Sequence, residues 1–215
     1  MTATAGPGTV LIDYKAGNLT SVSLALSKVG VAHTISDDPD LVRKADRLVF
    51  PGVGAAGQAM SNLRSTGLDK ALLEVVRRGD PVLGICIGCQ ILLESSEEDG
   101  GVECLGVLPG KVKRFDFSHL PVPRPKVPHM GWNPVEFLRP HPLFDGIANG
   151  THFYFVHSFY PAPTNAKNTL GTTEYGGLSF TSVLDGGNVV ATQFHTEKSG
   201  EPGVRLLKNF GSWKP

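Results

Sequence analysis

The first half of the chain alternates short apolar runs with stretches whose apolar residues recur at helical spacing. The apolar runs indicate buried strands at 9–14, 31–36, 46–54 and 81–86. A first helix is expected after Asn18, which is placed to cap it, and it ends at Gly30. Further helices are expected over 67–80 and from residue 88 onward. The first helix has one apolar stripe, formed by Leu19, Val22, Leu26 and Val29. Strands alternating with helices predict a parallel sheet with helices on both faces.

The second half is richer in strand-like runs, which lie at 102–108, 111–117, 151–160, 178–184 and 188–195. The DGGN stretch joins the last two runs as a hairpin. The proline-rich stretch 121–134 is expected to be an irregular surface segment, and a closing helix is predicted over 202–213, with Pro202 near its start. We therefore predict a flexible tail over 1–8 and a single α/β domain over 9–215, with a mixed, largely parallel sheet.

The composition argues against several classes of protein. Among the 215 residues, Lys plus Arg and Asp plus Glu each number 20, so charge gives no reason to expect a nucleic acid or an anionic membrane as partner. The chain has no apolar run near the roughly 20 residues of a membrane helix, and its start lacks the pattern of a signal peptide. Three cysteines form no evident disulfide framework, so a reducing cytoplasm is the expected location.

The stretch GICIGCQ contains Cys86 and Cys89, and it admits three chemical interpretations. A zinc site needs about four ligands, usually as two spaced pairs, but only one pair is present and Cys104 stands alone. A thioredoxin-type redox pair is possible in an α/β protein. The third interpretation is a nucleophile on a sharp strand-to-helix turn, because glycines flank Cys86 at G-x-C-x-G spacing. A buried cysteine that only packs is the plain alternative.

On such a turn, small neighbours permit a strained backbone at Cys86. The start of the following helix favours the thiolate, and the Ile87 N–H points toward a developing oxyanion. A catalytic cysteine also needs a base and a group that orients the base. His195 follows a strand-like run, and Glu197 lies two residues further on. Because residues i and i+2 of an extended segment share a face, Glu197 can hold the imidazole that takes the proton from Cys86.

Together, GICIGCQ and QFHTEKSG resemble the triad-type class I glutamine amidotransferases. The stretches PGVGAAG, KVPHMGWN and YFVHSFY narrow the resemblance to the glutaminase subunits of imidazole glycerol phosphate synthases. The resemblance runs from about Thr9 to Phe210 and implies a flavodoxin-like domain. It also implies hydrolysis of L-glutamine to glutamate and ammonia through a thioester, without a metal or an organic cofactor.

The resemblance also implies a role for particular residues. The catalytic triad would be Cys86, His195 and Glu197. The oxyanion would be held at Ile87 and at Gly52 and Val53, which lie in the loop 51–54 that must rearrange for activity. Glutamine would be bound by Gln90, Glu98, His157 and Ser158, while Phe153 and Phe155 pack in the core. For Glu98, a solvated acidic loop remains the alternative.

The family implies a heterodimer with a cyclase subunit, a (β/α)8 barrel that receives ammonia and forms imidazole glycerol phosphate and AICAR in histidine biosynthesis. The residues that match the interface with this partner are Pro128, Met130, Trp132, Tyr154 and Lys198. Trp132 suits an interface hot spot, with core packing as the alternative.

Two positions depart from the family pattern. Thr196 stands where proline is usual, which leaves Glu197 less preorganised, although we expect activity to survive. Cys89 stands where methionine is common, and it raises the hypothesis that a Cys86–Cys89 disulfide silences the enzyme under oxidation.

Other functions remain open on sequence alone. The nearest is a glutaminase subunit of an anthranilate, aminodeoxychorismate or pyridoxal phosphate synthase, against which PHMGWN argues. A free-standing γ-glutamyl hydrolase and a non-enzymatic binding protein on the same fold are more distant alternatives, because fold alone does not set function.

Overall fold

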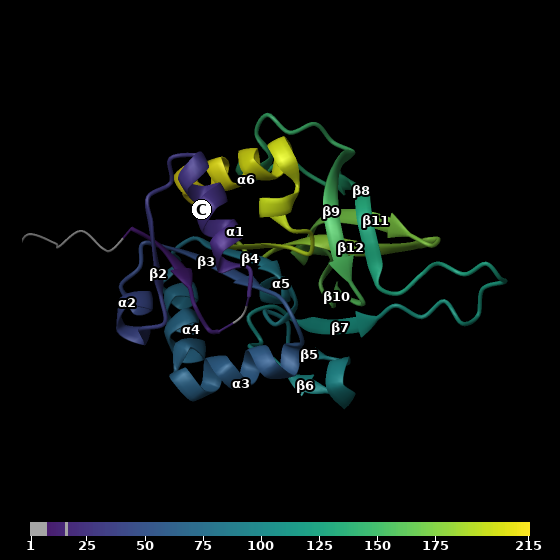
Figure 1. Ribbon diagram of the computed structural model, residues 1–215, viewed down its shortest axis with the longest axis horizontal. Helices are drawn as coiled ribbons and strands as arrows, with labels where there is room; N and C mark the ends of the chain where they lie inside the picture. The colour runs from purple at the N-terminus through teal and green to yellow at the C-terminus, as the bar shows by residue number, and fades with distance from the viewer. Residues whose placement is uncertain (1–7, 16) are drawn as a thin grey trace, which may run out of the picture.

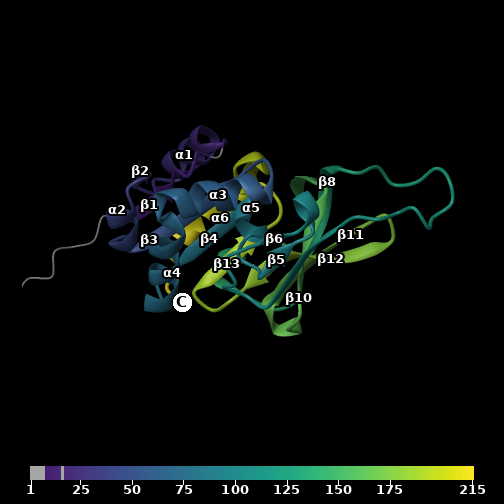
Figure 2. The ribbon, with the colours of Figure 1, turned by 90° about the horizontal axis from the view of Figure 1, so that it is seen from below.

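The computed structural model describes residues 8–15 and 17–215, so most of the tail predicted over 1–8 lies outside the described residues. Within them, the chain forms a nine-stranded sheet in the order β2-β1-β3-β4-β13-β12-β11-β8-β9, and helices pack on both of its faces (Figure 1). A smaller four-stranded sheet, in the order β10-β7-β5-β6, lies beside it (Figure 2).

The large sheet has a parallel part and an antiparallel part. The parallel strands are β1 (Thr9–Ile12), β2 (His33–Ser36), β3 (Arg47–Gly52), β4 (Val82–Cys86) and β13 (Val189–Thr192). The antiparallel strands are β12 (Leu178–Asp185), β11 (Thr169–Tyr175), β8 (His129–Phe137) and β9 (Thr151–His157). The mixed sheet predicted from the sequence is therefore present, but it is less parallel than predicted, because the second half of the chain adds an antiparallel extension with as many strand pairings as the parallel part.

The helices cover the parallel part. One face packs against α3 (Ala56–Thr66) and α4 (Leu68–Arg78), and α2 (Pro39–Arg43) lies against α4. The other face packs against α1 (Leu19–Lys28) and α6 (Gly200–Ser212). Alternate residues of β1 and β3 supply the two cores, because successive side chains of a strand point to opposite faces: Val10 and Phe50 lie in one cluster, and Leu11 and Val49 in the other.

Short elements complete the chain. The small sheet is formed by β5 (Ser95–Ser96), β6 (Val102–Glu103), β7 (Gly110–Arg114) and β10 (Phe159–Pro163). The helix α5 (Ile87–Gln90) is a single turn, and the 3-10 turns are η1 (Glu98–Gly100), η2 (Pro142–Phe144), η3 (Ala166–Asn168) and η4 (Thr196–Lys198). Of the described residues, no helix is both long and apolar enough to cross a membrane.

Several predicted elements differ from the observed ones. The proline-rich stretch is irregular only up to residue 128, because β8 begins at His129 and pairs with β9 from His129 to Val135. Pro134 is tolerated because β11 pairs with β8 only at Glu136 and Phe137. The predicted strand 151–160 divides at Ser158 into β9 and β10, which belong to different sheets.

Other differences concern lengths and omissions. The run 102–108 is a strand only at Val102–Glu103, and the helix expected from residue 88 onward is the one-turn α5. The sequence prediction omitted α2, α3 and β11. The hairpin through DGGN, the helix that ends at Gly79 and the closing helix with Pro202 in its first turn are confirmed.

Candidate active site

Cys86 occupies the sharp turn between β4 and α5 that the sequence predicts. Its backbone has φ 55° and ψ −108°, a conformation that side-chain-bearing residues rarely adopt. Both flanking glycines are required by close packing: a Cβ at Gly84 would lie 2.9 Å from Ala191 Cβ, and one at Gly88 would overlap the carbonyl oxygen of Phe50. The G-x-C-x-G spacing therefore has a steric cause, and the turn is a nucleophile elbow.

His195 and Glu197 meet as a pair just beyond β13. His195 Nδ1 lies 2.8 Å from Glu197 Oε1, and both side chains are almost fully buried. Their segment is not extended as we expected, because Thr196–Lys198 forms the 3-10 turn η4. Ser199 stabilises this turn, since its hydroxyl donates to the His195 carbonyl and its backbone N–H to the Thr196 carbonyl. The turn therefore forms without the proline that Thr196 replaces.

Asn18 also contacts the carboxylate of Glu197, a contact that was not predicted from the sequence. It lies at the start of α1 as predicted, but its side chain makes no capping hydrogen bond, so the predicted capping role is wrong. Instead, Asn18 Nδ2 donates to Glu197 Oε1 at 2.6 Å. No local pattern relates residues 18 and 197, so only the packing of α1 against η4 reveals this contact.

The charges at this site reinforce one another. Burial alone lowers the pKa of His195, but the nearby Cys86 and Glu197 outweigh it and raise the pKa to about 10. Burial alone raises the pKa of Glu197, but His195 and Asn18 outweigh it, and the pKa falls below its ordinary value. His195 Nε2 is buried and has no hydrogen-bond partner among the described residues. His195 is therefore well placed to hold a proton, and Glu197 to remain ionised beside it.

A cavity of roughly 310 Å³ opens over Cys86 and His195. All four residues expected to bind glutamine line this cavity, namely Gln90, Glu98, His157 and Ser158. Val53 and Ile87 line it as well, and Gly52 lies beside Cys86 in the register of β3 and β4. The positive φ in this loop is at Gly54, at 94°. The fold thus brings together residues that are distant in the sequence at the carboxyl ends of parallel strands.

The hydrogen bonds of the cavity residues limit what each can offer a ligand. His157 Nδ1 contacts the Phe159 carbonyl at 2.7 Å and its Nε2 contacts His129 Nδ1 at 2.9 Å, so both ring nitrogens are occupied. Burial lowers the pKa of His157 to about 3, which keeps the ring neutral. A direct hydrogen bond from the His157 imidazole to glutamine would require one of these contacts to break.

Glu98 lies at the cavity in η1, but it is not a free acidic group. Its Oε2 accepts a hydrogen bond from the backbone N–H of Ala56 at 2.6 Å, at the start of α3. Burial raises the pKa of Glu98, and the hydrogen bond from Ala56 only partly offsets this effect. The fully solvated loop considered from the sequence is therefore wrong for Glu98, which is half buried and held in place.

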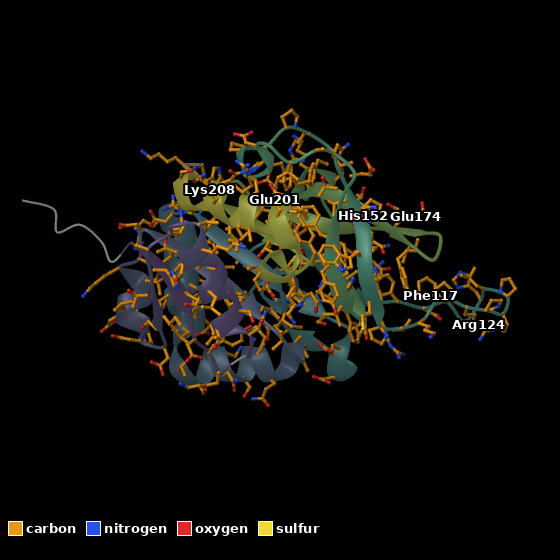
Figure 3. The ribbon with its side chains drawn as sticks, turned by 45° about the horizontal axis from the view of Figure 1, so that its top comes forward. Phe117, Arg124, His152, Glu174, Glu201 and Lys208 are labelled. Carbon is orange, nitrogen blue, oxygen red and sulfur yellow. The ribbon has the colours of Figure 1, made fainter. Side chains whose placement is uncertain are left out.

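The residues expected to face a partner lie on and around β8 and β9. Met130 and Trp132 are 62% and 51% exposed, so the core-packing alternative for Trp132 is wrong. Tyr154 pairs with Trp132 in the β8–β9 register, and Pro128 lies at the cavity rim. Lys198 is exposed on η4. The segment before β8 extends away from the sheets, with Arg124 near its far end (Figure 3), whereas Phe153 and Phe155 are fully buried as predicted.

The three cysteines are free, and the described residues contain no cluster that could hold a metal ion. Cys89 packs into the core cluster with α3 and α4, whereas Cys86 belongs to the cluster on the other face of the sheet. Burial raises the pKa of Cys89 well above its usual range, and the neighbouring Cys86 adds to the effect. A protonated, inward-facing thiol is a poor partner for the disulfide that we hypothesised.

Comparison with known proteins identifies close relatives. The family model "Glutamine amidotransferase class-I" matches residues 10–212. The chain is 52% identical over 207 residues to a Desulfovibrio desulfuricans protein named imidazole glycerol phosphate synthase subunit HisH, which covers 93% of this chain and 92% of that protein. A Moorella thermoacetica protein of the same name is 50% identical over 201 residues, covering 94% of this chain and 92% of that protein.

Solved structures are similar in fold at much lower identity. One described as a glutamine amidotransferase superposes with a TM-score of 0.71 at 20% identity and covers 96% of this chain and 100% of its own. A PurLQS structure from Thermotoga maritima has a TM-score of 0.71 at 17% identity and covers 95% and 97%. These similarities concern the fold, and they confirm the fold class predicted from the sequence.

Proposed function

The chain belongs to the class I glutamine amidotransferase family, and from that premise we propose that it is the glutamine-hydrolysing subunit of an imidazole glycerol phosphate synthase. About half of its residues are identical to those of proteins bearing that subunit's name, over 93% to 94% of its length. This observation carries the proposal, because the match is too long to reflect shared motifs alone. The subunit serves histidine biosynthesis by supplying ammonia.

The reaction would begin at Cys86. His195 Nε2 takes the thiol proton, and the sulfur attacks the side-chain amide carbon of glutamine. The backbone N–H groups of Ile87 and Val53 would hold the resulting oxyanion, and such donors are typically worth about 100- to 1000-fold in rate. His195 then returns the proton to the departing nitrogen, so ammonia leaves and a γ-glutamyl thioester remains. Water activated by His195 hydrolyses the thioester to glutamate and restores the thiol.

Glu197 and the cavity residues would support these steps. Glu197 keeps the His195 ring oriented through its 2.8 Å contact and stabilises the imidazolium that forms after proton transfer. Glu98 faces the cavity with one carboxylate oxygen beyond its contact with Ala56, and this oxygen would bind the α-ammonium group of glutamine. We assign the α-carboxylate to the Ser158 side of the cavity.

A cyclase subunit would receive the ammonia and use it to form imidazole glycerol phosphate and AICAR. Its docking surface would include Met130, Trp132, Tyr154 and Lys198, with Pro128 at the rim of the cavity. Two exposed apolar residues on one strand favour a partner, because a large exposed aromatic is typical of interface hot spots. Enclosing the cavity would also keep ammonia from escaping to solvent.

The assay that tests this function measures glutamate released from glutamine. The chain would be assayed alone, with the cyclase subunit, and with the cyclase plus its ribonucleotide substrate, each beside Cys86→Ala. We expect little release alone, strong release in the full mixture and none from the variant. Strong release by the chain alone, unchanged by the cyclase, would point instead to a free-standing γ-glutamyl hydrolase or a glutaminase of another synthase.

A further inference from the structure

Gln193 is fully buried beside the nucleophile, although its residue type suggests an exposed position. The parallel register of β13 and β4 pairs Thr192 with Ile85, so the next residues along, Gln193 and Cys86, lie next to each other. Gln193 Nε2 lies 3.8 Å from Cys86 Sγ, within hydrogen-bonding range of a sulfur acceptor. His195, two residues further along the chain, lines the same cavity as Cys86.

A neighbouring amide determines which end of Gln193 faces the sulfur. Gln90 Nε2 donates to the Phe159 carbonyl at 2.9 Å, which identifies its donor end. The same nitrogen donates to Gln193 Oε1 at 2.9 Å. Turning the Gln193 amide over would place two donors against each other, so its oxygen must face Gln90 and its NH₂ group must face Cys86.

Two other features of the fold act on the Cys86 sulfur, namely the helix that follows it and His195. This helix, α5, spans only Ile87–Gln90, so the helix-dipole stabilisation expected from the sequence is confined to one turn. His195 approaches from the end of β13 and must give up and regain a proton during the reaction. A donor that never titrates stabilises the thiolate without taking part in proton transfer.

We propose that Gln193 is a further catalytic residue, which donates a hydrogen bond from Nε2 to the Cys86 thiolate and is held in that orientation by Gln90. The proposal rests on the function above, in which Cys86 is the nucleophile. It links the substrate cavity to the nucleophile, because Gln90 lines the cavity and orients the donor. Binding of glutamine near Gln90 would therefore affect the hydrogen bond to the Cys86 sulfur through the side-chain amide of Gln193.

The test is the pH dependence of Cys86 alkylation by iodoacetamide, followed by mass spectrometry of the peptide that carries it. This reaction needs neither glutamine nor the cyclase, so it succeeds or fails independently of the proposed function. Gln193→Met removes the donor at similar volume, and we expect the midpoint of the pH profile to rise by about one pH unit. Gln90→Met removes the group that orients the Gln193 amide, so we expect a smaller rise in the midpoint of the pH profile.

Thr192→Val is the matched control. It removes a buried hydrogen bond on the adjacent residue, from the Thr192 hydroxyl to the Phe194 carbonyl, without removing a group that contacts the sulfur. Its alkylation midpoint should equal that of the unsubstituted protein, and thermal unfolding verifies that all variants are folded. An unchanged midpoint in either glutamine variant would overturn the proposal, as would a slower reaction at every pH without a shift in midpoint.

Discussion

The buried corner around His195 and Glu197 and the antiparallel extension at β8 and β9 place their polar and apolar side chains in opposite ways. In the corner, polar side chains are buried and contact one another: Glu197 Oε1 alone receives both His195 and Asn18. On the extension, apolar side chains such as Met130 and Trp132 are exposed. The first region is organised within one chain, whereas the second has a surface suited to another protein. The buried polar contacts and the exposed apolar surface are thus located in different parts of the molecule.

The two regions meet at a pair of histidines. His129 begins β8, next to the exposed residues, and its Nδ1 lies 2.9 Å from His157 Nε2. His157 in turn lines the cavity over Cys86. Aromatic rings surround the pair, with Tyr175 stacked on His129 at 4.0 Å between ring centroids. The histidine pair therefore connects the start of β8 directly to the cavity.

The largest effect is expected from acid, which lowers the stability of the fold through this histidine pair. Burial lowers the pKa of His157 to about 3, whereas an unfolded histidine titrates near pH 6.5, so the unfolded chain binds the proton first as pH falls. Stability contributed by neutral His157 is therefore complete above about pH 6.5 and is lost toward pH 3, at up to ~1.4 kcal/mol per unit. Burial lowers the pKa of His129 in the same direction.

Urea unfolding between pH 7 and pH 4 measures this loss. His157→Gln should flatten the dependence of the unfolding free energy on pH, whereas His119→Gln, at an exposed position, should leave the slope as it is. Equal slopes in His157→Gln and the unsubstituted protein would show that His157 is not held neutral.

Trp132→Ala removes an aromatic side chain from the exposed region and leaves the buried corner unchanged. Loss of a central aromatic at an interface typically costs 2 kcal/mol or more, so we expect cyclase affinity to fall about 30-fold. The stability of the isolated chain should stay within about 0.5 kcal/mol, because half of the side chain is exposed. Titration calorimetry with the cyclase measures the affinity. Ile35→Ala, on the opposite edge strand β2, is the control, and an equal loss there would contradict the assigned surface.

Asn18→Ala removes a contact of the buried corner and leaves the exposed region unchanged, and it is expected to have the smallest effect. Glu197 loses one of its two partners, so His195 is held less firmly, and we expect kcat for glutamine hydrolysis in the full complex to fall about tenfold. KM should change little, because Asn18 does not line the cavity. Ser23→Ala removes a different hydrogen bond of α1, to His33, and should leave kcat unchanged. A rise in KM with constant kcat would place Asn18 in binding instead.

Local patterns were sufficient for the elements with a clear period or a clear turn signal. Gly79 ends α4, DGGN forms the hairpin, and G-x-C-x-G forms the elbow, since each depends on residues close in sequence. Proline content was misleading at 129–134: Pro134 pairs with His152 of β9, but β11 pairs with β8 only at Glu136 and Phe137, so the missing N–H on that side costs no ladder hydrogen bond. The helix α3 was missed although Ala56, Ala59, Met60 and Leu63 have helical spacing and are buried.

The sequence alone determined the fold class, the position of Cys86 on its turn, and His195 with Glu197 as the accompanying pair. These follow from short-range geometry, where a few residues dictate the backbone. Only the tertiary structure decided that Asn18 contacts Glu197, that Gln193 faces the sulfur, and that His157 has no free ring nitrogen. Those contacts join residues far apart in the chain, and which of them form depends on strand register and helix packing.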